Sequence, residues 1–161
     1  MRGLLSWCEH RPPIDASFPP FPVNGSGSVV PRVPVEGALA WFMGSSYQPE
    51  HQMERSDLDN QARNFEHLQQ LLPELARHLA LAFSGTTLKT WKGTRCVTAD
   101  RLPAVGPLET QAQPSLWLCA GMGSRGMSFS VLCAELLAAR MGAEPLPLEA
   151  KLARSLEALR A

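Results

Sequence analysis

The turn at residues 121–126, Gly-Met-Gly-Ser-Arg-Gly, is the stretch of the sequence whose residues are best suited to bind a ligand. It follows an apolar run at 116–121 and precedes an expected helix at 125–140, so it presents unpaired backbone N–H groups and the positive end of a helix dipole. Glycines allow a ligand close to the backbone, and Arg125 adds a planar cation suited to a carboxylate or phosphate. The turn favours an anion or an electron-rich carbonyl. A tight strand-to-helix connection with a solvated arginine would explain the same residues.

A dinucleotide-binding fingerprint is not expected at this turn. That fingerprint belongs to a βαβ unit, and no such unit follows the turn in this sequence.

A second stretch, at residues 91–106, makes the functional prediction more specific. Arg95 alone would normally be a solvated or paired arginine, and Asp100 to Pro103 alone would be an ordinary strand exit. The stretch nevertheless has the pattern W-x-G-x-R-x-x-T-x-D-x-x-P-x-x-G, whose elements here are Trp91, Gly93, Arg95, Thr98, Asp100, Pro103 and Gly106.

Together the two stretches resemble the C-terminal half of the FAD-dependent amine oxidases of the D-amino-acid-oxidase and glycine-oxidase superfamily. Within it, the chain looks most similar to the oxidoreductase half of the bacterial bifunctional enzymes that complete 5-methylaminomethyl-2-thiouridine in tRNA. The segments that carry this likeness are "RGLLSW", "FPVNGSGSVVPRVP", "WFMGSSYQPEHQM", "NQARNFEHLQQLLPELA" and residues 120–160.

The resemblance implies an α+β fold, mainly an antiparallel sheet with helices packed on it. Residues 1–118 would form the substrate-domain sheet and helix, and residues 119–161 the flavin-contacting turn and C-terminal helices. The N-terminal Rossmann unit that holds FAD in this superfamily, and the methyltransferase half of the bifunctional enzymes, have no counterpart in the sequence. We therefore expect a C-terminal fragment that neither retains FAD nor catalyses by itself.

The implied reaction removes the carboxymethyl group from 5-carboxymethylaminomethyl-(2-thio)uridine at the tRNA wobble position. Hydride passes to the flavin, and the resulting imine hydrolyses to glyoxylate and the aminomethyl base.

Arg95 is the first candidate for binding the substrate carboxylate. Arg125 is the second, with the flavin edge or a tRNA phosphate as its other possible partners. No dedicated catalytic base and no metal are expected. The residues expected to contact the cofactor are Gly121, Met122, Gly123, Ser124, Arg125, Gly126 and Met127.

Two other functions fit the same residues. One is an FAD-dependent oxidase of free glycine or another small amino acid. The other is a non-catalytic substrate-type domain that serves as an interaction module. An apolar face left bare by the missing parts would favour dimerisation.

Composition sets the remaining bounds. The chain has 161 residues and a formal net charge of zero, which gives no global electrostatic argument for nucleic acid or membrane binding. No apolar stretch approaches the roughly 18–20 residues of a membrane span, and the start does not read as a signal peptide. The four cysteines show no metal-ligand spacing, and two of them, Cys119 and Cys133, lie in apolar runs. A reduced, cytoplasmic protein is expected.

Several elements must position these residues. Strands are expected at 2–7, at 28–37 and 38–48 as a hairpin that turns at Glu36-Gly37, at 86–100 with Gly93 as a possible bulge, and at 116–121 as a buried strand. Helices are expected at 57–72, capped by Ser56 or Asp57, at 73–82 and at 149–160, and Gly142 is expected to end the helix at 125–140. Residues 11–27 and 101–115 are expected as connections. The four tryptophans are expected in the core. The apolar positions of the helix at 57–72 are Leu58, Ala62, Phe65, Leu68 and Leu72.

Overall fold

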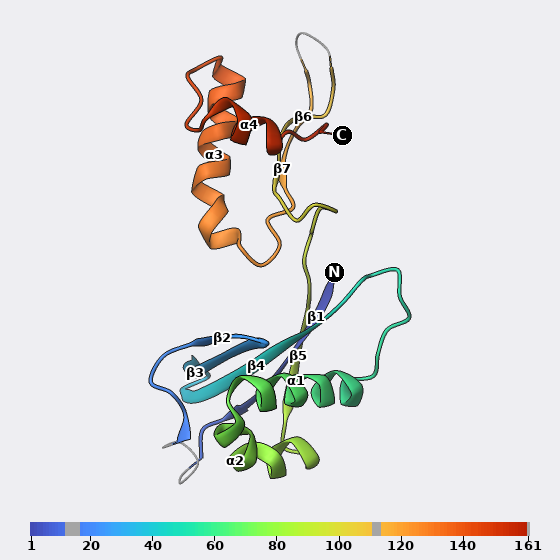
Figure 1. Cartoon of the computed structure of the whole chain (residues 1–161), viewed down its shortest axis with the longest axis vertical. Helices are drawn as coiled ribbons and strands as arrows, with labels where there is room; N and C mark the ends of the chain where they lie inside the picture. Colours follow the sequence, from blue (N-terminus) through green and yellow to red (C-terminus); the bar gives the residue numbers. More distant parts are fainter. Residues whose placement is uncertain (12–16, 111–113, 161) are drawn as a thin grey trace. The chain divides into compact units, whose positions relative to one another are not determined.

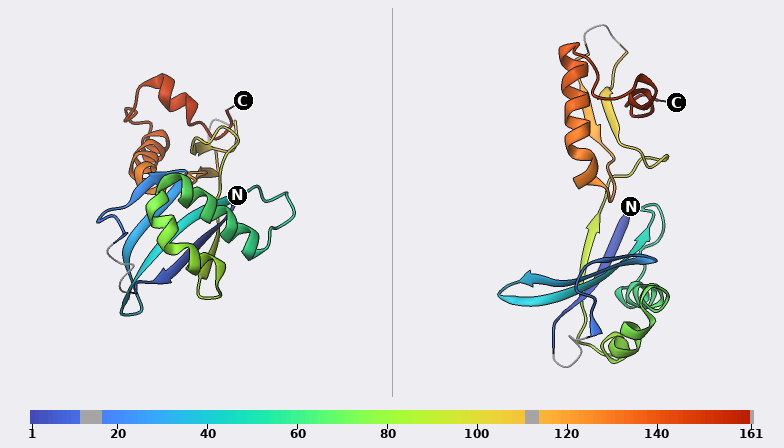
Figure 2. Two further views of the ribbon diagram at one scale, coloured as in Figure 1. Left: turned by 60° about the horizontal axis from the view of Figure 1, so that its bottom comes forward. Right: turned by 60° about the vertical axis from the view of Figure 1, so that its left-hand side comes forward.

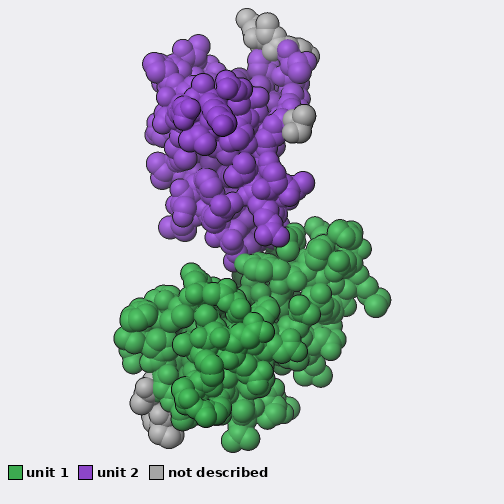
Figure 3. Space-filling model, in the orientation of Figure 1, with its two compact units in different colours: residues 1–94 green, residues 95–161 purple. Residues whose placement is uncertain are grey.

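The computed structural model describes residues 1–11, 17–110 and 114–160. The chain forms two compact units, residues 1–94 and 95–161 (Figure 3). The expected α+β class, with an antiparallel sheet and packed helices, is confirmed (Figure 1). The elements in chain order are β1 (Arg2–Glu9), β2 (Val23–Gly25), β3 (Gly27–Val35), β4 (Ala38–Gln48), α1 (Asp57–Leu71), α2 (Pro73–Ser84), β5 (Lys89–Thr94), β6 (Ala104–Pro107), β7 (Trp117–Ala120), α3 (Gly126–Gly142) and α4 (Ala150–Ser155).

Unit 1 is built on a five-stranded antiparallel sheet with the strand order β2-β3-β4-β1-β5. The expected hairpin is present: β3 and β4 are joined by two residues, Glu36 and Gly37, with φ values of 48° and 86°. Two positive φ values in a two-residue loop match the twist of the flanking strands, which explains the sharp turn at this dipeptide.

Helices α1 and α2 lie together on one face of this sheet (Figure 2). Ser56 caps α1, as predicted, since its hydroxyl accepts a hydrogen bond from the Asp59 amide at 3.1 Å. Pro73 is the first residue of α2, where its missing N–H costs nothing. The kink between the predicted helices therefore becomes a break at Leu72.

The predicted apolar face of α1 is only partly right. Leu68 is fully buried, whereas Leu58 is 76% exposed and Ala62 is also exposed. The side of α1 that faces the sheet instead buries polar side chains, because the inner strands β1 and β4 offer them partners: the Leu4 carbonyl and the Ser6 hydroxyl accept from Asn64, and the Ser46 hydroxyl donates to Asn60. The buried polar residues of this face are Asn60, Gln61 and Asn64.

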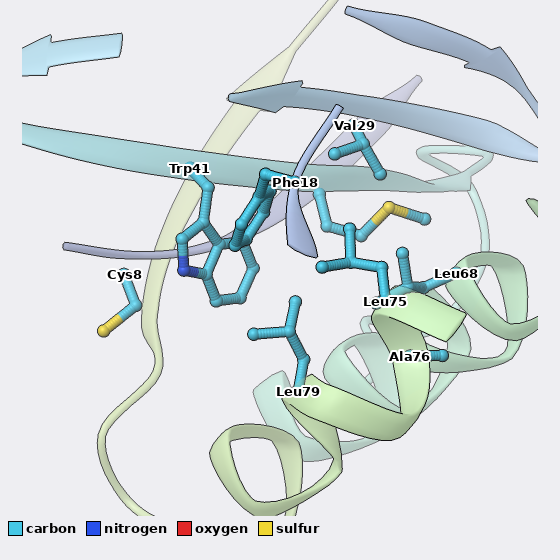
Figure 4. Close-up of a cluster of buried hydrophobic side chains, with 9 residues drawn as sticks. Cys8, Phe18, Val29, Trp41, Leu68, Leu75, Ala76 and Leu79 are labelled. Carbon is cyan, nitrogen blue, oxygen red and sulfur yellow. The ribbon is translucent and has the colours of Figure 1, made fainter. Parts of the chain in front are cut away.

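The core of unit 1 fills the space between the two helices and the sheet (Figure 4). Trp41 belongs to it, as predicted, and is 3% exposed. Trp91 does not: its side chain is 54% exposed, because residues of β5 alternate between the helix-covered face and the opposite face. The core consists of Cys8, Phe18, Val29, Trp41, Met43, Leu68, Leu75, Ala76 and Leu79.

Unit 2 pairs the short hairpin β6–β7 with α3 and α4 around a second core. The region 101–115, expected as a loop, contains strand β6; residues 111–113 of that expected loop lie outside the described residues. Strand β7 is not buried as expected, and Cys119 is exposed, because the sheet has only two strands. Cys133 is buried, and burial raises the pKa of its thiol. The core residues are Val105, Cys133, Leu136, Ala153 and Leu156.

Three further local expectations are wrong. Gly93 is not a bulge, since it pairs in register with Gly3. Helix α3 includes Gly142, and the left-handed residue after it is Ala143, with φ 52°, whose position lets the Glu144 amide bond to the Ala139 carbonyl. The predicted helix at 149–160 is shortened to α4, because its C-terminal part turns back to hydrogen-bond with β6 and the loop before it.

The expected connection at 11–27 includes the short strand β2, and its residues 12–16 lie outside the described residues. None of the helices in the described part of the chain is both long and apolar enough to cross a bilayer.

Candidate functional site

The turn between β7 and α3 depends on two glycines. Gly121 and Gly123 have φ values of 77° and 58°, a backbone conformation that glycine adopts without steric cost. Gly121 is also buried, and a methyl group on its Cα would lie 2.8 Å from Cγ2 of Thr98. Glycine is therefore required at position 121 for both conformation and space.

The turn packs along the chain segment that follows β5. The Gly123 amide donates to the Cys96 carbonyl at 3.2 Å, and Val97 forms an antiparallel bridge with Met122. Arg95, which is half-buried, directly precedes this contact. The two stretches that the sequence singled out, 91–106 and 121–126, thus meet inside unit 2 through Cys96 and Val97.

The N-terminus of α3 is open beside the turn. Arg125 is the N-cap residue, and its carbonyl accepts from the amides of Ser128 and Phe129, both at 3.0 Å. The amides of Gly126 and Met127 precede the helical hydrogen-bond ladder. A methyl group on Gly126 would meet nothing within 4 Å, and Met127 is 95% exposed. A flat or anionic group can therefore approach the helix end at Gly126 without displacing protein atoms.

The Arg125 side chain links the turn to the preceding motif. Its Nη2 donates to the Arg101 carbonyl at 2.5 Å, and its Cζ lies 4.8 Å from the centre of the Phe129 ring. The residue is exposed. The guanidinium thus joins the 98–103 loop to the first turn of α3 and leaves a positive charge at the mouth of the turn.

Asp100 anchors the C-terminal segment to the motif. Its two carboxylate oxygens accept from Nε and Nη2 of Arg160 at 2.7 and 2.8 Å, and Oδ1 also accepts from the Leu102 amide at 3.0 Å. These hydrogen bonds, led by those from Arg160, hold the pKa of Asp100 well below its usual range. Thr98 completes the loop by donating from Oγ1 to the Leu102 carbonyl at 2.5 Å.

Pro103 and Gly106 shape the strand that follows this loop. Pro103 is fully buried, and Gly106 has a φ of 132°. A methyl group on Gly106 would lie 3.0 Å from Nη1 of Arg140, which donates to the Val105 carbonyl, while Nη2 of Arg140 donates to the Ala153 carbonyl at 2.7 Å. Gly106 therefore makes room for the guanidinium that ties β6 to α4.

Sequence reasoning missed three residues that build this region: Arg140, Arg160 and Phe129. The sequence offered a signal for Arg160 alone. Asp100 of the motif needs a cationic partner once its loop packs against the protein, and that partner comes from a remote part of the chain.

Gly121, Gly123 and Gly126 have the spacing Gly-x-Gly-x-x-Gly. The structure sets them after an antiparallel hairpin rather than in a βαβ unit, so the context of a dinucleotide fingerprint is absent from the described part of unit 2.

A polar cavity of about 350 Å³ lies in unit 1, beside the first turn of α1 and the ends of β1, β4 and β5. Its charged groups pair with one another: Lys92 Nζ lies 2.6 Å from Asp57 and 3.5 Å from Glu54, and Arg2 lies 3.9 Å from Glu54. Its amides are also engaged, since Gln48 bonds to backbone groups of the 53–55 segment. This network fastens residues 49–56 to the sheet, and we assign it no ligand.

The comparison with known families gives the class of protein that the turn and the motif indicated. The family model described as FAD dependent oxidoreductase matches residues 7–140, most of the chain. The chain belongs to this family of FAD-dependent oxidoreductases.

Two relatives of the chain are proteins of one kind. The chain is 57% identical over 164 residues to the tRNA 5-methylaminomethyl-2-thiouridine biosynthesis bifunctional protein MnmC of Albidiferax ferrireducens, covering 99% of this chain and 27% of the relative. It is 47% identical to the MnmC protein of Polaromonas naphthalenivorans, covering 97% of this chain and 24% of the relative. The chain therefore spans about a quarter of the length of these relatives.

Two solved structures share the fold. Glycine oxidase from Geobacillus kaustophilus superposes with a TM-score of 0.68 at 17% identity, covering 99% of this chain and 38% of that one. Iminodiacetate oxidase from Chelativorans sp. BNC1 superposes with a TM-score of 0.61, also at 17% identity, covering 92% of this chain and 37% of that one.

Proposed function

We propose that this chain is the substrate-domain part of an FAD-dependent oxidoreductase that removes the carboxymethyl group from 5-carboxymethylaminomethyl-(2-thio)uridine at the tRNA wobble position. The observation that carries the proposal is the turn of unit 2, where a glycine-dependent backbone opens the N-terminus of α3 beside the motif of Arg95. The MnmC relatives, at 47–57% identity, supply the substrate class.

The residues present fit a flavin at this turn. The amides of Gly126 and Met127 and the dipole of α3 would hold the electron-rich edge of the ring, and Gly126 leaves the space for it. When bound, the flavin supplies the acceptor for the hydride that leaves the carbon beside the substrate amine. The chain's own contribution is to hold that edge and to stabilise negative charge on it.

Arg95 is the residue we assign to the substrate carboxylate. A guanidinium binds a carboxylate through two parallel hydrogen bonds, which fixes the orientation of an N-substituted glycine as well as its charge. The Arg125 guanidinium bonds to the Arg101 carbonyl and lies over the Phe129 ring, which holds it beside the turn. We assign Arg125 to the mouth of the turn, where it adds positive charge beside the flavin edge.

The proposal is tested in a chimera. This chain replaces the matching 164 residues of the Albidiferax MnmC protein, which supplies the rest of a full-length enzyme. Visible absorbance after gel filtration reports retained FAD, and glyoxylate release from tRNA reports the reaction. We expect both. Release of glyoxylate from free glycine but not from tRNA would favour the amino-acid oxidase instead, and FAD retention with neither reaction would favour a non-catalytic domain.

Variants of the chimera separate binding from positioning. Arg95→Ala should raise the KM for tRNA by about 10- to 100-fold, the cost of losing hydrogen bonds to a charged group, and leave FAD retention unchanged. The matched control is Arg63→Ala, at an exposed position on α1. An Arg95→Ala chimera with the KM of the parent would remove Arg95 from the substrate site. Gly126→Val should lower FAD retention, because its side chain fills the space that the flavin edge would occupy.

A further inference from the structure

The face of the unit 1 sheet opposite α1 and α2 is rich in aromatic side chains. Along β1, Leu4, Ser6 and Cys8 are buried toward the helices, so Leu5 and Trp7 point the other way. The strand register pairs Leu5 with Trp91 and Trp7 with Phe42, which places all four side chains on the same open face. The rings of Trp7 and Phe42 stack there, with centres 5.4 Å apart and planes at 13°.

Two rings on this face, Trp91 and Tyr47, lie over glycines. Gly3 of β1 pairs with Gly93 of β5 on one side and with Tyr47 of β4 on the other. A methyl group on Gly93 would lie 2.5 Å from Cη2 of Trp91, and one on Gly3 would lie 3.5 Å from Cε1 of Tyr47. The Trp91 indole therefore covers Gly93, and the Tyr47 ring leans over Gly3. The paired glycines Gly3 and Gly93 lie on neighbouring strands, which are about 4.8 Å apart. The rings above these two glycines therefore lie next to each other.

Both rings remain accessible in spite of this support. Trp91 is 54% exposed and Tyr47 is 42% exposed. A large aromatic side chain offers 150–250 Å² of surface, so these fractions leave roughly 200 Å² of ring surface open to solvent. A stable protein dimer buries about 800 Å² on each partner, far more than these two rings offer by themselves, whereas their area matches that of a small planar group.

We propose that Trp91 and Tyr47 form a stacking platform for an unpaired pyrimidine base of RNA. This inference rests on the proposed function, which supplies tRNA as the substrate, and it names the residues that would meet the base. Sequence-specific RNA recognition commonly uses splayed-out bases stacked on aromatic side chains, including those on the open face of a sheet. The motif residue Gly93 then has a defined task, because only glycine leaves room for the Trp91 ring at that point.

The platform is tested by RNA binding to the chain itself. The probe is a fluorescein-labelled single-stranded oligouridylate, with a duplex RNA of the same length for comparison, and fluorescence anisotropy gives the Kd. We expect the single strand to bind more tightly than the duplex. Trp91→Ala and Tyr47→Ala should each raise the Kd about 5- to 100-fold, the usual loss for one stacked base. Trp91→Phe should restore most of the affinity.

Two variants control this measurement. Leu81→Ala removes an apolar side chain that is 86% exposed on α2, away from the sheet, and should leave the Kd unchanged. Gly93→Ala keeps Trp91 but displaces its ring, and should weaken binding as Trp91→Ala does. Circular dichroism and thermal melting show whether each variant keeps the fold of the parent.

Several results would overturn the platform: no binding of oligouridylate by the parent, equal binding of duplex and single strand, or a folded Trp91→Ala variant with the parent's Kd. A dimer in sedimentation that Trp91→Ala dissociates would assign the face to self-association instead.

The proposed function can fail separately. A chimera that oxidises tRNA with a KM unaffected by Trp91→Ala leaves the reaction standing and removes the platform. Trp91-dependent binding of oligouridylate without tRNA oxidation leaves the platform standing and removes the reaction.

Discussion

Asp100 and Arg160, sixty residues apart in the sequence, form a bidentate ion pair in which Nε and Nη2 of the arginine donate to the two carboxylate oxygens at 2.7 and 2.8 Å. The same guanidinium donates to the carbonyls of Leu102 and Pro103. The pair therefore closes unit 2: it fixes the loop of the motif and the C-terminal segment to each other at one point. The first prediction follows from its charge.

Replacing Asp100 by asparagine should make stability less sensitive to acid. The usual pKa of this carboxyl, near 3.8, applies to the unfolded chain, and the folded value lies lower. Between the two values the unfolded chain binds more protons, so acid favours unfolding. The stabilisation is complete above about pH 4 and is lost as the pH falls below that. Thermal melting should show the parent above Asp100→Asn by a constant margin from pH 8 to pH 5, and a shrinking margin below pH 4.

The control for this series is Glu66→Gln, at an exposed position on α1. Its melting temperature should follow that of the parent at every pH. A margin between the parent and Asp100→Asn that stayed constant down to pH 2 would show that the ion pair contributes nothing through its charge.

Gly121→Ala should destabilise the fold while Gly126→Ala should not. At position 121 the added methyl group meets Thr98 and the φ of 77° is left-handed, which costs about 1–2 kcal/mol for a residue with a Cβ, before the clash is counted. At position 126 the methyl group meets nothing, and alanine is a better helix residue than glycine. Urea unfolding of the two variants measures the difference. Equal free energies of unfolding would show that the turn is not held in the conformation described.

Asn64→Ala should cost about 1–3 kcal/mol of stability. The Asn64 side chain is fully buried, and its Nδ2 donates to the Leu4 carbonyl at 3.1 Å and to the Ser6 hydroxyl at 3.0 Å. Removing the amide leaves both acceptors without this donor in a place closed to water. Chemical denaturation gives the change, and the exposed Gln69→Ala on the same helix should stay within about 0.5 kcal/mol of the parent. A neutral Asn64→Ala would mean that water replaces the amide.

Leu79→Ala and Leu81→Ala form a matched pair on α2. Leu79 is 2% exposed and packs in the unit 1 core, whereas Leu81 is 86% exposed. The first substitution should cost about 2–5 kcal/mol through lost burial and the cavity left behind, and the second less than about 0.5 kcal/mol. Thermal or urea unfolding measures both. Similar losses at the two positions would contradict the orientation of α2 on the sheet.

The sequence was most informative where structure depends on neighbouring residues. Glu36-Gly37 predicts its turn, since a two-residue hairpin needs positive φ values, and Ser56 predicts its cap, since a hydroxyl before a helix satisfies an otherwise unpaired amide. The pattern of Trp91 to Gly106 and the glycines of the turn were enough to indicate the oxidoreductase family that the comparison then showed. The expected division of the chain at residues 118–119 stays a prediction, since compactness divides it after Thr94 and says nothing of flavin contact. The expected roles of Arg95, Arg125 and residues 121–127 likewise remain predictions.

Only the tertiary structure decided which face of each strand is covered. Trp41 and Trp91 both lie on strands, yet one is in the core and the other is open, because the helices pack on a single face of the sheet. The same holds for Asn64, whose burial depends on β1, and for Asp100, whose partner comes from the far end of the chain. Turn chemistry and hydrophobic period act over a few residues and are written in the local sequence. Burial and pairing depend on which elements meet, and that is settled only when the whole chain packs.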